Sequence, residues 1–136
     1  PNVINANDWQ TALVPVYYDI INRYQHGYED IKTVFTIHNI QYQGQYGLEL
    51  INDIMGIPLY HTDLLSYDGD VNFMKAAIET ADKVTTVSPS YAWEILDPWY
   101  SHGLDRELVN KQYKLCGILN GIDQKIYDPA TDPVIA

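Results

Sequence analysis

Residues 35–44, FTIHNIQYQG, place polar side chains directly after an apolar run. His38 and Asn39 follow the run, and Tyr42 and Gln43 come just before Gly44. A histidine at the end of a strand can present its ring or its backbone carbonyl to a ligand, but it can equally hydrogen-bond to the local backbone. The spacing favours neither interpretation. The segment is therefore a candidate binding site, and the choice depends on which residues lie beside it in the fold.

Polar residues also follow the other three apolar, β-branched runs of the chain. Asp8 follows the first run, Ser88 ends the third and Asn120 ends the fourth. In an open parallel sheet, ligands bind beyond the carboxyl ends of the strands, which share one edge. We therefore expect these side chains to lie along one rim with His38. Each also has a local alternative, because Asp8 and Ser88 can cap helices and Asn120 can begin a turn.

The four runs are predicted to be strands of a parallel sheet, since short runs without strict alternation are typical of strands buried on both faces. They lie at 2–5, 32–38, 83–88 and 114–120. Helical periodicity occurs between them, at 13–24, at 71–81, from Ser88 onward and at 104–112. The alternation predicts a Rossmann-like α/β fold with helices on both faces of the sheet. The long insert at 39–70 is expected to contain a short helix at 48–56.

The composition predicts one globular domain and argues against two classes of partner. The chain has 136 residues and a formal net charge of −10, with only eight Lys and Arg. Nucleic acids and anionic membrane surfaces both bind through cations, so neither partner is expected. No apolar run approaches the roughly 20 residues of a membrane helix. The single cysteine, Cys116, lies in an apolar run, which predicts a buried thiol and a cytoplasmic protein.

Several chemistries lack their motifs in this sequence. There is no GxGxxG or Walker loop and no GxSxG elbow. The four histidines are not spaced as metal ligands, so we expect neither a metal nor a cofactor. No carboxylate pair stands out as a glycosidase dyad.

Four long blocks in order carry a resemblance that covers nearly the whole chain. They are NANDWQTALVPVYY, TVFTIHNIQYQG, VNFMKAAIETADKVTTVSPSYAWEI and CGILNGIDQKIYDPATDP. Together they resemble bacterial glycogen synthase and its plant relative, starch synthase. The resemblance implies a retaining glucosyltransferase of the two-domain GT-B type, which transfers glucose from ADP-glucose or UDP-glucose to the non-reducing end of an α-1,4-glucan without a metal. This chain matches the later part of the N-terminal domain.

The resemblance also assigns roles to individual residues. His38 matches the family's active-site histidine, which lies against the donor glucose and helps to stabilise an oxocarbenium-like transition state. Asp8 matches the acidic residue of the family's H-x-x-D-W-H block, which faces the same cleft. Asn120 matches the asparagine of N-G-[IV]-D near the donor sugar. The segment bordering the glucan acceptor supplies three further matches: Asn39, Tyr42 and Gln43.

The same resemblance predicts what the chain contains. Residues 1–128 correspond to part of the N-terminal Rossmann-like domain, and residues 129–136 to the start of the interdomain linker. The family often has His where this chain has Asn5 and Gln10, but Asp8 and Trp9 are kept. The family's Lys-x-Gly-Gly segment and its C-terminal domain have no counterpart here. We therefore expect the chain alone to be inactive, and to self-associate through an exposed sheet edge.

Two other functions stay open. The Tyr-rich insert is compatible with a non-catalytic glucan-binding or regulatory module. Another retaining GT-B enzyme, such as a sucrose synthase, is a further alternative, although the blocks HNIQYQG and NGIDQKIYDPATDP fit it less well.

Overall fold

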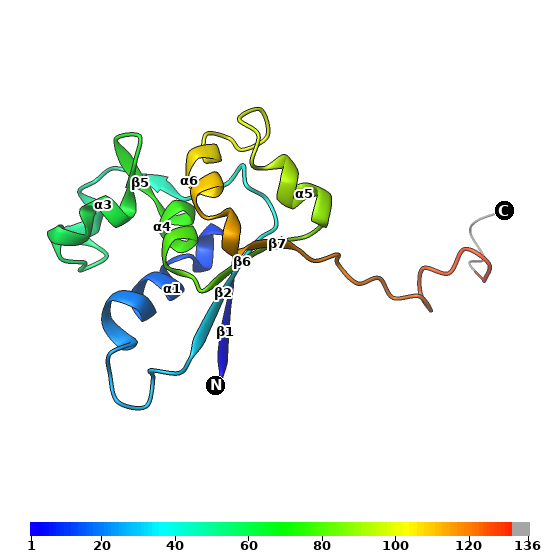
Figure 1. Ribbon diagram of the computed structural model, residues 1–136, viewed down its shortest axis with the longest axis horizontal. Helices are drawn as coiled ribbons and strands as arrows, with labels where there is room; N and C mark the ends of the chain where they lie inside the picture. The colour runs from blue at the N-terminus through cyan, green and yellow to red at the C-terminus, as the bar shows by residue number, and fades with distance from the viewer. Residues whose placement is uncertain (132–136) are drawn as a thin grey trace.

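A parallel four-stranded sheet is the main sheet of the molecule in a computed structural model, which describes residues 1–131 (Figure 1). Its strands are β1 (Val3–Asn7), β2 (Lys32–Ile37), β6 (Lys83–Thr86) and β7 (Leu115–Gly117), in the order β1-β2-β6-β7. All neighbouring pairs are parallel. The predicted α/β fold with a parallel sheet and flanking helices is therefore confirmed, and all four predicted strands are present.

The helices lie between the strands, as the apolar periodicity predicted. They are α1 (Leu13–Tyr17), α4 (Phe73–Thr80), α5 (Pro89–Glu94) and α6 (Asp105–Asn110). The chain continues from α1 into a π-helical turn at Tyr18–Asn22. Pro15 falls in the first turn of α1, where its missing N–H has no helical partner to lose. Ser88 caps α5 through a hydrogen bond from the Tyr91 N–H, with Pro89 as the first helical residue.

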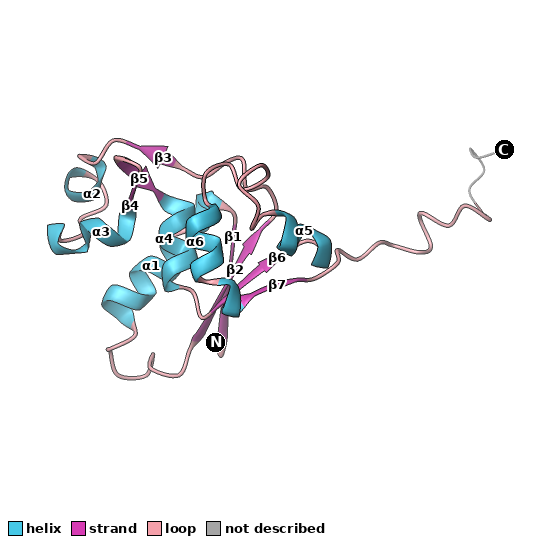
Figure 2. Cartoon of the chain, turned by 45° about the horizontal axis from the view of Figure 1, so that its top comes forward, coloured by secondary structure: helices cyan, strands magenta, loops and turns pink. Residues whose placement is uncertain are grey.

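The helices pack into one core on one face of the sheet, whereas the sequence predicted helices on both faces. The core side of the sheet presents Ala6, Phe35 and Val84, and the opposite side presents Asn5 and Thr36. The strand order explains the difference. It runs in one direction, and right-handed crossovers between successive strands then all return on the same side. Figure 2 shows α1, α4 and α6 together beside the strands.

The prediction of a buried Cys116 thiol is wrong, and the open face of the sheet explains why. Its thiol is exposed, because Cys116 aligns with Thr85 and Thr36 across the sheet, on the side away from the helical core. Strands β1 and β7 have unpaired outer edges within residues 1–131. Self-association through such an edge stays a prediction, which sedimentation at rising protein concentration would test.

The insert between β2 and α4 is more structured than the sequence indicated. A small antiparallel sheet in the order β3-β5-β4 is made by β3 (Gln45–Tyr46), β4 (Ser66–Tyr67) and β5 (Asp70–Asn72). The predicted helix in the insert is present as α2 (Leu50–Asp53), and α3 (Thr62–Leu65) follows it. The rings of Trp9, Tyr46 and Phe73 cluster with centroids 5.4–6.4 Å apart. This cluster joins the insert to the segment after β1.

After β7 the chain leaves the body as an extended segment (Figure 1). The predicted linker at 129–136 lies mostly outside the described residues, and the domain boundary stays a prediction. Within residues 1–131, none of the helices has the length and apolar character needed to cross a bilayer.

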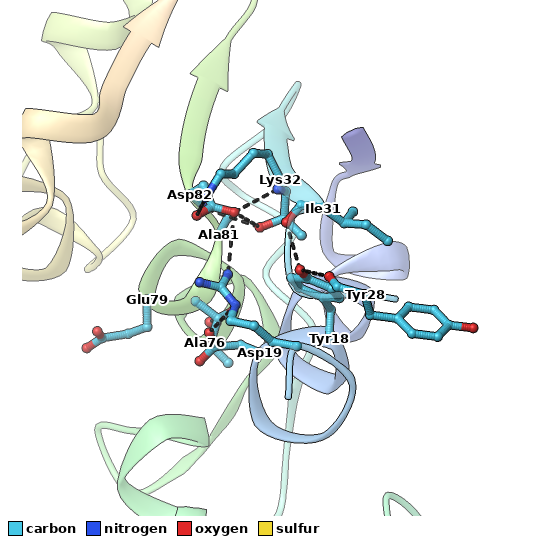
Figure 3. A network of polar contacts seen from close by, with 12 residues as sticks. Tyr18, Asp19, Tyr28, Ile31, Lys32, Ala76, Glu79, Ala81 and Asp82 are labelled. Carbon is cyan, nitrogen blue, oxygen red and sulfur yellow. Dashed lines mark hydrogen bonds and ion pairs between the residues drawn. The ribbon is translucent and has the colours of Figure 1, made fainter. Parts of the chain in front are cut away.

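Asp82, just before β6, joins the amino-terminal ends of β2 and β6 through hydrogen bonds to its carboxylate. Its Oδ2 accepts hydrogen bonds from the Thr33 N–H at 2.8 Å and the Thr33 hydroxyl at 3.1 Å, and it lies 3.4 Å from the Arg23 guanidinium. Figure 3 shows Asp82 beside Lys32, whose Nζ is 4.0 Å away. Burial opposes ionisation of the Asp82 carboxyl, but the hydrogen bonds from Thr33 and the two cations outweigh it and lower the pKa.

This lowered pKa predicts a pH-dependent contribution to stability. The carboxylate stabilises the fold above the unfolded-state pKa of about 4, and the contribution is lost as the pH falls through the folded-state pKa. We expect Asp82→Asn to lower the free energy of unfolding by about 1 kcal/mol at pH 7, and by progressively less toward pH 3, measured by urea denaturation. Asp19→Asn is the control, because Asp19 forms only a partly exposed pair with Arg23. An Asp82 effect of equal size at both pH values would contradict the role of its charge.

Candidate functional site

The loop at 38–44 begins at the carboxyl end of β2, and the Asp8 carboxylate holds its first turn. Oδ1 of Asp8 accepts the backbone N–H of His38 at 2.8 Å and that of Asn39 at 3.3 Å. The Asp8 N–H in turn donates to the Thr36 carbonyl at 2.9 Å. Asp8 therefore joins the end of β1 to the end of β2 and fixes the direction in which His38 leaves the strand.

The backbone of Asp8 is strained in the conformation that makes this contact. Its φ is 55° and its ψ 178°, a region occupied almost only by glycine. Such a conformation costs on the order of 1–3 kcal/mol and persists where other contacts enforce it. The alternative role of Asp8 as a helix cap is wrong, because its side chain makes no cap hydrogen bond to the turn that follows. The carboxylate reaches across the sheet instead.

His38 and Asn120 line the same pocket, as the rim argument predicted. The pocket has a volume of about 330 Å³ and lies on the helix-free side of the sheet. Polar and apolar side chains of three strands form its floor: Asn5, Asn7, Val34, Thr36 and Thr85. The His38 Nε2 lies 3.0 Å from the Asn7 Oδ1, which orients the ring.

Asn39 and Tyr42 lie on the same loop but outside this pocket. Both are exposed, and the Asn39 Oδ1 accepts the Gln41 N–H at 3.0 Å within the turn. Tyr42 is 61% exposed, so its ring is available to a partner. Substrate binding by these two residues stays a prediction. Ser88, the other residue of the predicted rim, is engaged as the cap of α5.

Gln43 differs from its neighbours because its side chain is only 5% exposed. Its amide nitrogen donates to the carbonyls of Ile40 and His102, and its amide oxygen accepts from Asn72. The predicted contact with substrate also stays untested. The observed contacts of the Gln43 side chain are all within the chain.

Three residues that support the loop were missed by the sequence analysis. Asn7 orients His38, Asn72 binds Gln43, and the Tyr91 hydroxyl accepts the Ile40 N–H at 3.2 Å. The position of Asn7 just after the first run and next to Asp8 was an available signal. The contacts of Asn72 and Tyr91 with the loop span 29 and 51 positions in the chain, and no local pattern reveals them.

The arrangement is suited to holding a neutral, hydroxyl-rich ligand. The pocket offers imidazole, amide and hydroxyl groups, which both donate and accept hydrogen bonds. None of the side chains that line it carries a fixed charge. Among residues 1–131, no group of three or more His, Cys, Asp or Glu side chains is placed to hold a metal ion.

Comparison with known proteins shows where this segment belongs. A glycogen synthase of Exiguobacterium sibiricum is 43% identical over 134 residues, which are 97% of this chain and 28% of that protein. A glycogen synthase of Rhizobium tropici is 45% identical over 137 residues, covering 100% of this chain and 28% of that protein. The chain thus spans just over a quarter of the length of these relatives.

A solved structure gives the same answer for the fold. The catalytic domain of starch synthase IV from Arabidopsis thaliana, bound to ADP and acarbose, matches with a TM-score of 0.79 and 36% identity. The match covers 98% of this chain and 28% of that one. The family model described as the starch synthase catalytic domain matches residues 1–110. The resemblance predicted from the four sequence blocks is confirmed, and the chain belongs to the starch synthase catalytic domain family.

Proposed function

We propose that the protein containing this segment is a retaining glucosyltransferase, which moves glucose from ADP-glucose or UDP-glucose to the non-reducing end of an α-1,4-glucan. The observation that carries the proposal is the pocket shared by His38 and Asn120, with Asp8 holding the loop that presents His38. The homologous plant structure, bound to ADP and acarbose, supports ligands of these two classes. The cytoplasm is the proposed location.

In this proposal His38 lies against the donor glucose. Its ring is held by Asn7, and its backbone N–H is engaged by Asp8, so the carbonyl and the second ring nitrogen are the groups free to face a sugar. Positive charge develops at the anomeric carbon as the bond to the nucleotide breaks. The second ring nitrogen of His38, whose lone pair can face the sugar while Nε2 donates to Asn7, is fixed before the reaction together with the carbonyl dipole, and both stabilise that charge without reorganising. Asn120, across the pocket, is suited to hydrogen-bonding the hydroxyls of the same sugar.

The role of His38 predicts a loss of turnover in the full-length protein. We expect His38→Ala to lower kcat for transfer from ADP-glucose to maltooligosaccharides by about 100-fold or more, since one preorganised electrostatic contact is worth this much. Radiolabelled glucose incorporation measures it. His26→Ala is the matched control, because His26 is fully exposed and its one ion pair within residues 1–131 is with Glu29. Normal turnover in His38→Ala would contradict the proposal.

The isolated segment is expected to be inactive. It spans 28% of the relatives' length, and the pocket of His38 is open on the helix-free side of the sheet. A transfer site must exclude water from its donor, which an open pocket does not do. No incorporation above background is expected when the 136-residue chain is incubated with ADP-glucose and maltooligosaccharide. Incorporation that disappears in His38→Ala would contradict this expectation.

A further inference from the structure

The side chains of Gln43 and Asn72 form a buried amide pair beneath the loop. Gln43 is 5% exposed and Asn72 is not exposed at all. The Asn72 amide nitrogen donates to the Gln43 Oε1 at 2.6 Å. The Gln43 Nε2 donates to the Ile40 carbonyl at 3.1 Å and the His102 carbonyl at 3.0 Å. Both hydrogens of the Gln43 amide are thereby used.

This pair connects three segments that are far apart in the chain. Ile40 lies in the loop after β2, Asn72 ends β5 just before α4, and His102 lies between α5 and α6. The same Asn72 caps α4 by accepting the Lys75 N–H at 3.0 Å. A change at Gln43 therefore acts on the loop, on the start of α4 and on the segment around His102 together.

The backbone of the loop is bound to α4 at the same place. The carbonyls of Gly44 and Gln43 accept the N–H groups of Phe73 and Met74, at 3.1 and 3.0 Å, so the loop itself satisfies the open N-terminus of the helix. Gly44 has a φ of 67°, and a Cβ there would lie 2.7 Å from the Trp9 ring. The chain can follow this path only with glycine at that position.

We infer that Gln43 is a positioning residue, which holds the loop at 38–44 in register with α4 and so sets where His38 stands relative to the donor sugar, and Asn39 and Tyr42 relative to a bound glucan. The inference rests on the proposed function for what the loop does, and on the hydrogen bonds of Gln43 for how the loop is held. Gln43 acts through the loop and does not itself touch the substrate.

Because its amide is buried, the Gln43 side chain favours one particular arrangement of the loop. A glutamine removed from water needs all its donors and acceptors paired, and only one arrangement of the loop supplies Ile40, His102 and Asn72 together. An apolar residue at position 43 would leave the amide nitrogen of Asn72 without its acceptor. We therefore expect the loss of the Gln43 side-chain amide to loosen the loop, while the sheet below keeps its structure.

Amide hydrogen exchange, followed by NMR on the 136-residue chain, tests how the loop is held. Gln43→Met removes the side-chain amide. Asn72→Asp is the second variant, because it keeps the oxygen that caps α4 but no longer donates to Gln43. Gln41→Met and Asn52→Asp are the matched controls, since both residues are exposed.

We expect both test variants to accelerate exchange of the Ile40, Phe73 and Met74 amides at least tenfold, with the Phe35 amide of β2 unchanged and both controls like the wild type. Unchanged exchange at the three amides would overturn the inference. So would an equal acceleration at Phe35, which would make Gln43 a general stabiliser of the fold.

Turnover in the full-length protein tests whether this positioning serves the reaction. Gln43→Met is expected to lower kcat at saturating ADP-glucose at least tenfold, with the thermal midpoint of the protein nearly unchanged. Normal kcat in a variant whose loop exchanges faster would overturn the inference. If the wild-type protein transfers no glucose at all, the proposed function fails, and the exchange data still decide whether Gln43 holds the loop.

Discussion

The hydrogen bonds from the His38 and Asn39 amides to the Asp8 carboxylate are the interaction on which the candidate site depends. A hydrogen bond to a charged acceptor contributes about 1.5–3 kcal/mol, which is comparable to the cost of the strained Asp8 backbone. The contact thus explains how a non-glycine residue persists at a φ of 55°. Without it, the backbone amides of His38 and Asn39 lose the acceptor that holds the first turn of the loop to the end of β1.

Other hydrogen bonds support the far end of the same loop. A further set joins the strands of the sheet at their amino-terminal ends, away from the loop. Gln43 and Tyr91 hold the loop from below, and Asp82 joins the starts of β2 and β6. Polar groups placed on a rigid sheet and supported by neighbouring hydrogen bonds keep their geometry more closely than groups on a free loop. The structure therefore combines a fixed His38 with an exposed, available Tyr42.

Local patterns in the sequence predicted the parts of the fold that depend on local physics. The β-branched runs gave all four strands of the main sheet, and the Ser88-Pro89 pair gave the start of α5. The rim of polar residues followed from strand direction alone and correctly brought His38 and Asn120 to one pocket. The role of each residue in that pocket still came from the family resemblance.

Other features depend on contacts between distant segments, which local patterns do not contain. The open face of the sheet follows from strand order, and the exposure of Cys116 follows from that open face. The Asp8 carboxylate bonds to amides 30 and 31 positions away, so the local pattern in the sequence favoured its use as a helix cap. Gln43 could not be told from an exposed loop glutamine, because Asn72 and His102 become its partners only in the folded chain.

Asp8→Gly provides the most direct test of the central claim. Glycine accepts the φ of 55° without strain, so the variant removes the carboxylate while relieving the backbone. The account predicts that amide exchange at His38 and Asn39 becomes at least about tenfold faster, which corresponds to the loss of a hydrogen bond of roughly 1.4 kcal/mol, while the Phe35 amide in β2 keeps its protection. Unchanged protection at His38 and Asn39 in Asp8→Gly would contradict it.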